Sequence, residues 1–286
     1  GRSQAWLVDL RDVKGNRAIE ERGGGMVVGA LAKIAELADH DRIKSGYPGL
    51  AEAAGGLATP QIRAMATVGG NLLQRTRCWY YRAPESQCFK TGGNACRARS
   101  GDHLFHACFD LGPCISVHPS TLGMALMAYE ATVEVIGQPS RTIAELFGDG
   151  SDPSRDHQLP EGAVLAEIVL PPPKAGEQSA YMRAISRARA EWPLVEVLAR
   201  VGVTNGAIAW ARLAVGGVAP VPLRLHAVET ALVGAPADAS ALVDIAARST
   251  DGAKPLPMTG YKLDLLHGSI IEALERALAS KPVGGA

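Results

Sequence analysis

The sequence has few aromatic residues and no net charge. Phe, Trp and Tyr make up 5% of its 286 residues, and 29 Lys and Arg balance 29 Asp and Glu. Nucleic-acid-binding surfaces are usually strongly basic, and single strands are commonly gripped by stacked aromatic side chains. The composition therefore predicts no nucleic-acid partner and no attraction to an anionic membrane surface.

Long apolar runs are absent as well. A membrane-spanning helix needs about 20 predominantly apolar residues, and stretches such as 124–129 are far shorter. Residues 1–16 are polar and carry neither the apolar core nor the cleavage site of a signal peptide. We expect no membrane span, and a location in the cytoplasm or, after export with a signal-bearing partner, in the periplasm.

Cysteine is missing from most of the chain. Its five copies all lie between residues 78 and 114: Cys78, Cys88, Cys96, Cys108 and Cys114. An odd, local set in a chain long enough to bury a core argues against a disulfide framework. No C-x2-C pair occurs, so the usual spacing of zinc fingers and of compact ferredoxin clusters is excluded. Spacing alone leaves an iron–sulfur cluster, a zinc ion and reduced free thiols as alternatives.

The hydrophobic pattern predicts an α+β fold in two domains. We expect domains at 1–173 and 174–286, divided at the stiff Pro171-Pro172-Pro173, with a cysteine-bearing insertion at 75–114. The first domain has candidate strands at 6–10, 26–29, 132–136 and 163–170, and candidate helices at 30–40, 47–55 and 120–129. The second has strands at 180–186, 194–203 and 207–216, then helices at 225–233, 239–248 and 261–279.

One short segment has the composition of a ligand-binding loop. In Thr67-Val68-Gly69-Gly70-Asn71, the paired glycines let the backbone approach a ligand, and Thr67 and Asn71 add hydrogen-bonding side chains. The alternative interpretation is a tight Gly-Gly turn at the end of a strand.

The run ATVGGNLLQRTR at 66–77, which leads directly into Cys78, resembles the FAD-binding subunits of the molybdenum hydroxylases, the xanthine dehydrogenase and aldehyde oxidoreductase family. ISVHPS at 115–120, IVLPPP at 168–173, LAVGGVAPVPLR at 213–224 and the helix at 255–278 are also similar to that family. The resemblance implies an FAD-binding domain of the PCMH type, a cysteine-rich insertion, and a C-terminal domain with an antiparallel sheet and helices. It is nearest to the flavin subunits of periplasmic aldehyde oxidoreductases, whose insertion carries a [4Fe–4S] cluster.

The resemblance also implies the site residues. The cluster ligands would be Cys78, Cys88, Cys96 and Cys114, with Cys108 as an alternative fourth ligand. The family usually has Asp at the position of Thr121 and Lys at that of Arg183. Its members also carry a longer N-terminal segment with an A-G-G-T-like pyrophosphate loop, which we expect to be missing here. The FAD contacts would be Thr67, Gly69, Gly70, Asn71, Ser120, Thr121, Leu165 and Arg183.

The implied function is electron transfer within a heterotrimeric oxidoreductase. A large subunit would hold the molybdenum cofactor and oxidise the substrate, most simply an aldehyde. A small subunit with [2Fe–2S] clusters would pass the electrons to FAD on this chain, and FAD would pass them to an acceptor. No residue of this chain is then expected to be a catalytic acid or base. Two alternatives are a structural subunit that keeps a metal cluster but has lost FAD, and an interaction module stapled by zinc.

Overall fold

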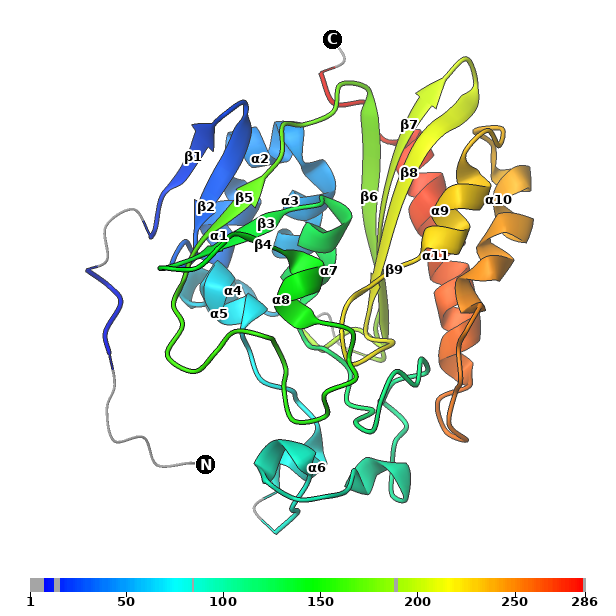
Figure 1. The fold of residues 1–286 in the computed structure, drawn as a ribbon. Helices are drawn as coiled ribbons and strands as arrows, with labels where there is room; N and C mark the ends of the chain where they lie inside the picture. The colour runs from blue at the N-terminus through cyan, green and yellow to red at the C-terminus, as the bar shows by residue number, and fades with distance from the viewer. Residues whose placement is uncertain (1–7, 13–15, 84, 188–189, 285–286) are drawn as a thin grey trace.

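Two antiparallel sheets organise the chain, with helices between and outside them and the cysteine-rich insertion at one end (Figure 1). The computed structural model describes residues 8–12, 16–83, 85–187 and 190–284. None of the helices in these ranges is long and apolar enough to cross a bilayer.

The first sheet has the strand order β1-β2-β5-β3-β4. Its centre is β5, where fully buried Ile168 pairs with Val28 on one side and Val133 on the other. The strands are β1 Ile19–Arg22, β2 Gly25–Gly29, β3 Thr132–Val135, β4 Arg141–Thr142 and β5 Leu165–Leu170. The helices around them are α1 Ile34–Asp39, α2 Asp41–Gly46, α3 Pro48–Gly55, α4 Pro60–Met65, α5 Val68–Leu72, α7 Thr121–Ala128 and α8 Ile143–Phe147.

The second sheet has the order β6-β7-β8-β9. Asn205 and Gly206 turn β7 into β8, and both have the positive φ that a tight hairpin requires. The longest helix, α11, packs on β6 and β7 and buries Leu266, Ile270 and Leu274 along one face. The elements are β6 Glu177–Ala184, β7 Val195–Thr204, β8 Ala207–Gly216, β9 Leu223–Arg224, α9 His226–Leu232, α10 Ala239–Ala246, the 3-10 helix Ala247–Thr250 and α11 Tyr261–Ala279.

The cysteine-rich insertion has little regular structure: α6 Trp79–Arg82 and the 3-10 turns Phe89–Thr91 and Arg97–Arg99. Ion pairs fasten it to the rest of the chain. Asp156, on the loop between α8 and β5, pairs with Arg75 and with Lys90, the latter at 2.9 Å, and the Asp156 and Lys90 side chains are only 5% and 6% exposed. Polar contacts thus replace much of the apolar core that the insertion lacks.

Three sequence predictions need correction. Residues 6 and 7 lie outside the described ranges, and 8–10 form no strand, because Val8 is 81% exposed and nothing covers its apolar side. The first strand is instead β1. The helix expected at 30–40 begins only at Ile34, and Gly69 and Gly70 lie inside helix α5 rather than in a tight turn.

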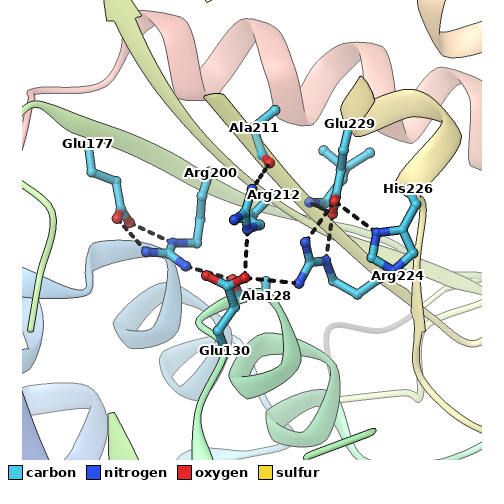
Figure 2. Close-up of polar contacts among 10 residues, drawn as sticks. Ala128, Glu130, Glu177, Arg200, Ala211, Arg212, Arg224, His226 and Glu229 are labelled. Carbon is cyan, nitrogen blue, oxygen red and sulfur yellow. Dashed lines mark hydrogen bonds and ion pairs between the residues drawn. The ribbon is translucent and has the colours of Figure 1, made fainter. Parts of the chain in front are cut away.

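Arg200 on β7 ties the second sheet to helix α7 (Figure 2). Its guanidinium makes two hydrogen bonds to the Glu177 carboxylate, at 2.9 and 2.6 Å, and donates a third to the Ala128 carbonyl at 2.6 Å. The guanidinium also lies 4.0 Å from the centroid of the Tyr129 ring. Both charged side chains are almost fully buried. A buried ion pair is tolerated only when its hydrogen bonds are satisfied, and Ala128, the last residue of α7, helps to satisfy them.

A second set of ion pairs extends this contact toward the surface (Figure 2). Glu130, just after α7, accepts a hydrogen bond from Arg212 at 2.8 Å and lies 3.6 Å from Arg224. Arg224 in turn binds Glu229 on α9 through two hydrogen bonds. The end of α7 is therefore held by three arginines of the second sheet.

We predict that Arg200→Met destabilises the chain by about 3–5 kcal/mol, because it leaves the Glu177 carboxylate buried without its partner. Arg212→Met, at the more exposed pair, should cost at most about 1 kcal/mol. Urea unfolding at neutral pH measures both. Equal and small losses for the two variants would contradict a structural role for the buried pair.

Candidate cofactor-binding site

The first turn of helix α5 lies in close contact with Ala30, the residue that follows strand β2. The Thr67 hydroxyl caps the helix by accepting a hydrogen bond from the Gly70 N–H at 3.1 Å. The Gly69 N–H donates to the Ala30 carbonyl at 2.8 Å, and a Cβ on Gly69 would lie 2.8 Å from the Ala30 Cβ. A side chain at position 69 would therefore push α5 away from the sheet.

Asn71 fixes α5 against α7. Its Oδ1 accepts hydrogen bonds from the Ser120 hydroxyl at 2.8 Å and from the Leu122 N–H at 3.3 Å. Ser120 itself caps α7 by accepting from the Gly123 N–H at 2.8 Å. The Ser120 hydroxyl is therefore occupied by these two bonds.

A cavity of about 620 Å³ lies beside these helices; we call it the α5 cavity. Its volume is within the usual range for small-molecule and cofactor sites. The structure brings five of the eight predicted FAD contacts to its wall: Thr67, Gly70, Asn71, Thr121 and Arg183.

The other three predicted contacts lie behind that wall. Gly69 faces Ala30, and Ser120 is spent on the helix cap. Leu165 pairs with Val135 in the first sheet and is 4% exposed within its core. Its position supports the sheet rather than the cavity surface.

Arg183 reaches the α5 cavity from strand β6. Its two terminal nitrogens donate to the carbonyls of Gly56 and Glu191, which fix the guanidinium at the cavity wall. Its Nε is buried and has no hydrogen-bond partner among the described residues. A buried donor without a partner is costly, so this N–H is a candidate contact for a bound ligand.

A second cavity, of about 360 Å³, adjoins the first; we call it the junction cavity. The two share Arg77, Pro119, Glu191, Trp192 and Pro193 as lining residues. The junction cavity is otherwise lined by Trp79, Phe105 and His106 of the insertion, by His118, and by Glu196 of β7.

Four of the five cysteines line a third, small cavity inside the insertion: Cys78, Cys88, Cys96 and Cys114. We call it the cysteine cavity. A hydrogen bond from Cys114 lowers the pKa of Cys96 to about 5, and the same bond together with burial raises the pKa of Cys114. Cys78 also lines the junction cavity, where its sulfur lies 3.3 Å from His106 Nε2.

Cys108 lies away from these four. It is fully buried in the core of the second sheet, where its N–H donates to Val218 and its carbonyl accepts from Lys254. Burial raises the pKa of its thiol to about 11. It therefore behaves as a small core residue that stays protonated.

In the described part of the chain, no three Cys, His, Asp or Glu side chains are grouped closely enough to hold one metal ion.

Two family models match the chain. One, described as the FAD binding domain in molybdopterin dehydrogenase, matches residues 2–173, and the other, the CO dehydrogenase flavoprotein C-terminal domain, matches 180–277. The chain belongs to the FAD-binding subunits of the molybdenum hydroxylases. The resemblance of the T-x-G-G-N segment to that family is thereby confirmed.

Relatives of this flavin subunit belong to several oxidoreductases. The aldehyde oxidoreductase FAD-binding subunit PaoB of Escherichia coli is 32% identical over 233 residues, which cover 79% of this chain and 72% of PaoB. The nicotinate dehydrogenase FAD-subunit of Eubacterium barkeri is 23% identical, with 80% of this chain and 65% of that subunit covered.

Solved structures of the family share the fold. CO dehydrogenase from Oligotropha carboxidovorans superposes with a TM-score of 0.71 at 22% identity, covering 96% of this chain and 82% of that one. Quinoline 2-oxidoreductase from Pseudomonas putida 86 gives 0.70 at 19% identity, covering 96% and 81%. At this identity the likeness shows the α+β fold of the flavin subunit alone.

Glu196 and Trp192, which line the junction cavity, were not expected from the sequence to lie at the site. Residues 194–199, at the start of β7, are all apolar except Glu196. Glu196 pairs across the strands with Arg183 on β6. An acidic residue in a buried strand was the available signal, because such a residue rarely occurs without a partner or a role.

His118 links the insertion to α7 as a neutral imidazole. It packs edge-on against Phe147 with centroids 4.3 Å apart, and its Nδ1 accepts a hydrogen bond from the Ser120 N–H. Burial lowers its pKa to about 4. Burial likewise lowers the pKa of His106 to about 4.

We predict that His118 makes the stability of the flavin subunit sensitive to acid. The unfolded chain binds a proton at this residue below about pH 6.5, whereas the folded chain resists protonation until about pH 4. The contribution of His118 to the free energy of unfolding, about 3 kcal/mol, is complete above pH 6.5 and is lost as the pH falls to 4. Unfolding curves at several pH values should show a smaller acid loss for His118→Phe than for the unaltered chain. Parallel losses would contradict the assignment.

Proposed function

We propose that this chain is the electron-transferring flavin subunit of a molybdenum-dependent oxidoreductase, with domains at 1–173 and 174–286. The observation that carries the proposal is the meeting of Thr67, Gly70, Asn71, Thr121 and Arg183 on one cavity. FAD would supply the redox chemistry, and the protein would bind and orient it.

The polar groups at the wall of the α5 cavity are suited to FAD. Gly70 presents bare backbone to the cavity, and a Cβ there would lie 2.8 Å from the Thr67 hydroxyl. Asn71 and Thr121 offer polar side chains, and Arg183 offers an N–H that lacks a partner among the described residues. These groups would hold the cofactor in a fixed position; none of them needs to act as an acid or base.

We further propose a [4Fe–4S] cluster held by Cys78, Cys88, Cys96 and Cys114. Support comes from the four sulfurs lining one cavity and from the position of Cys108 in a separate core. Thiolate is the form that binds iron; the hydrogen bond between Cys96 and Cys114 lowers the pKa of Cys96 and raises that of Cys114, and burial raises the pKa of Cys78. The junction cavity adjoins both sites, so cluster and flavin would be neighbours.

The partners would be a large subunit with the molybdenum cofactor and a small subunit with [2Fe–2S] clusters. Similarity to PaoB favours an aldehyde as substrate of the complex. Substrate oxidation would take place on the large subunit, and this chain would pass the electrons to an acceptor through FAD.

A structural subunit without FAD is the second candidate. The observation that favours it is Thr121, whose hydroxyl lines the α5 cavity where the resemblance leads us to expect a carboxylate. A hydroxyl is the weaker acceptor for a ligand hydroxyl group.

We predict that the chain, purified anaerobically with its partner subunits, shows flavin absorbance and contains about four more irons than its [2Fe–2S] clusters supply. Absorbance spectra and metal analysis measure both. Iron without flavin would select the structural candidate. A complex with neither excess iron nor flavin would contradict both assignments.

Single cysteine variants test the ligand set. We predict that Cys114→Ala loses the additional iron, whereas Cys108→Ala retains it and loses only about 1 kcal/mol or less of stability through core packing. Iron content per chain, with unfolding curves as a check of folding, distinguishes the two. Iron loss in Cys108→Ala alone would overturn the proposed set.

A further inference from the structure

Glu196 is a buried carboxyl that the proposed function leaves without a role. It is 2% exposed, on strand β7, and lines the junction cavity. A carboxyl in such a place costs free energy unless it is paired or used. No lysine or arginine forms an ion pair with it in the described part of the chain.

The two sheet neighbours of Glu196 are shaped around its carboxyl. The Tyr181 hydroxyl, on β6, donates to Oε2 at 2.8 Å. Gly216, opposite on β8, leaves the space that the carboxyl occupies, since a Cβ there would lie 2.5 Å from Oε1. The neighbouring strands thus provide both a hydrogen-bond donor and the space for a carboxyl at position 196.

The same carboxyl stands beside the α5 cavity. Arg183, which lines that cavity, is the residue paired with Glu196 across β6 and β7. Directly paired residues point to the same face of a sheet. Glu196 itself lines the junction cavity, and its neighbour Arg183 lines the adjoining α5 cavity.

We infer that the ring of the proposed FAD extends from the α5 cavity into the adjoining junction cavity, and that Glu196 is its proton-exchanging residue. When two electrons leave the reduced ring for an acceptor, a ring N–H bond breaks and an O–H bond forms on the Glu196 carboxylate. The electron pair goes to the acceptor, and the proton leaves through the junction cavity. The inference rests on the proposed function.

The groups around Glu196 agree with this role. Burial raises its pKa, while the hydroxyls of Tyr181 and Thr121 and the charge of Arg183 oppose that rise. A carboxyl whose pKa is raised by burial binds a proton more readily than an exposed one. The other titratable side chains that line the junction cavity are Arg77, Cys78, His106, His118 and Glu191.

The test uses the FAD-loaded complex, reduced with dithionite and reoxidised with ferricyanide, which accepts electrons but no protons. We expect Glu196→Gln, which keeps the shape and the hydrogen bond from Tyr181, to slow reoxidation on the order of 10²-fold. FAD affinity, measured by fluorescence, should stay within about threefold, a change of less than 1 kcal/mol. The matched control is Glu167→Gln on β5, which should reoxidise at the unaltered rate.

An infrared difference spectrum between the reduced and oxidised complex gives an independent readout. A carboxyl C=O band should change on reoxidation and vanish in Glu196→Gln. Should that variant fail to fold, Tyr181→Phe retains the carboxyl and should shift the same band, because the carboxyl loses its hydrogen bond.

Unaltered reoxidation in a folded Glu196→Gln, or an infrared spectrum with no such carboxyl band in either the unaltered complex or Tyr181→Phe, overturns the inference. A complex that contains no FAD overturns the proposed function and this inference together. The FAD content of the unaltered complex therefore separates the two failures.

Discussion

The contact between Arg200 and the end of helix α7 is the interaction on which the site depends. Arg200 comes from the second sheet, its partner Glu177 from the neighbouring strand, and the third hydrogen bond goes to Ala128 of helix α7. Because the ion pair is buried, breaking one of its hydrogen bonds would leave a charged group without a partner and lower the free energy of unfolding. The pair therefore keeps a fixed geometry. At the other end of α7, Asn71 and Ser120 join the helix to α5. A helix held at both ends places Thr121 between the sheets.

That placement makes one continuous site from parts that are distant in sequence. Thr67, Gly70 and Asn71 come from the start of helix α5 and Thr121 from helix α7. Arg183 and Glu196 come from the second sheet, and Cys78 and Trp79 from the insertion. The α5 cavity and the junction cavity share Pro119 and Trp192, and Cys78 lines both the junction and the cysteine cavities. Redox centres in adjoining cavities would exchange electrons without a large movement of the chain.

Local signals in the sequence predicted much of this. The helices expected at 120–129 and 261–279 and the strands expected at 194–203 and 207–216 depend on neighbours along the chain, and the structure confirms them as α7, α11, β7 and β8. The role of Gly69 was not predictable in this way, since it depends on Ala30, which is distant in sequence and follows strand β2. The Glu196 site depends on the register of three strands. Cys108 and Cys114 have similar surroundings in sequence. In the structure Cys108 is buried in the core of the second sheet, whereas Cys114 lines the cysteine cavity.

The central claim is that FAD and an iron–sulfur cluster occupy adjoining cavities of this chain. A crystal structure of the anaerobically prepared complex, with anomalous data at the iron edge, tests it most directly. The account predicts an iron peak bounded by Cys78, Cys88, Cys96 and Cys114, and a flavin ring beside Arg183 and Glu196. A map without iron among these cysteines, or a flavin ring away from Arg183, would contradict it.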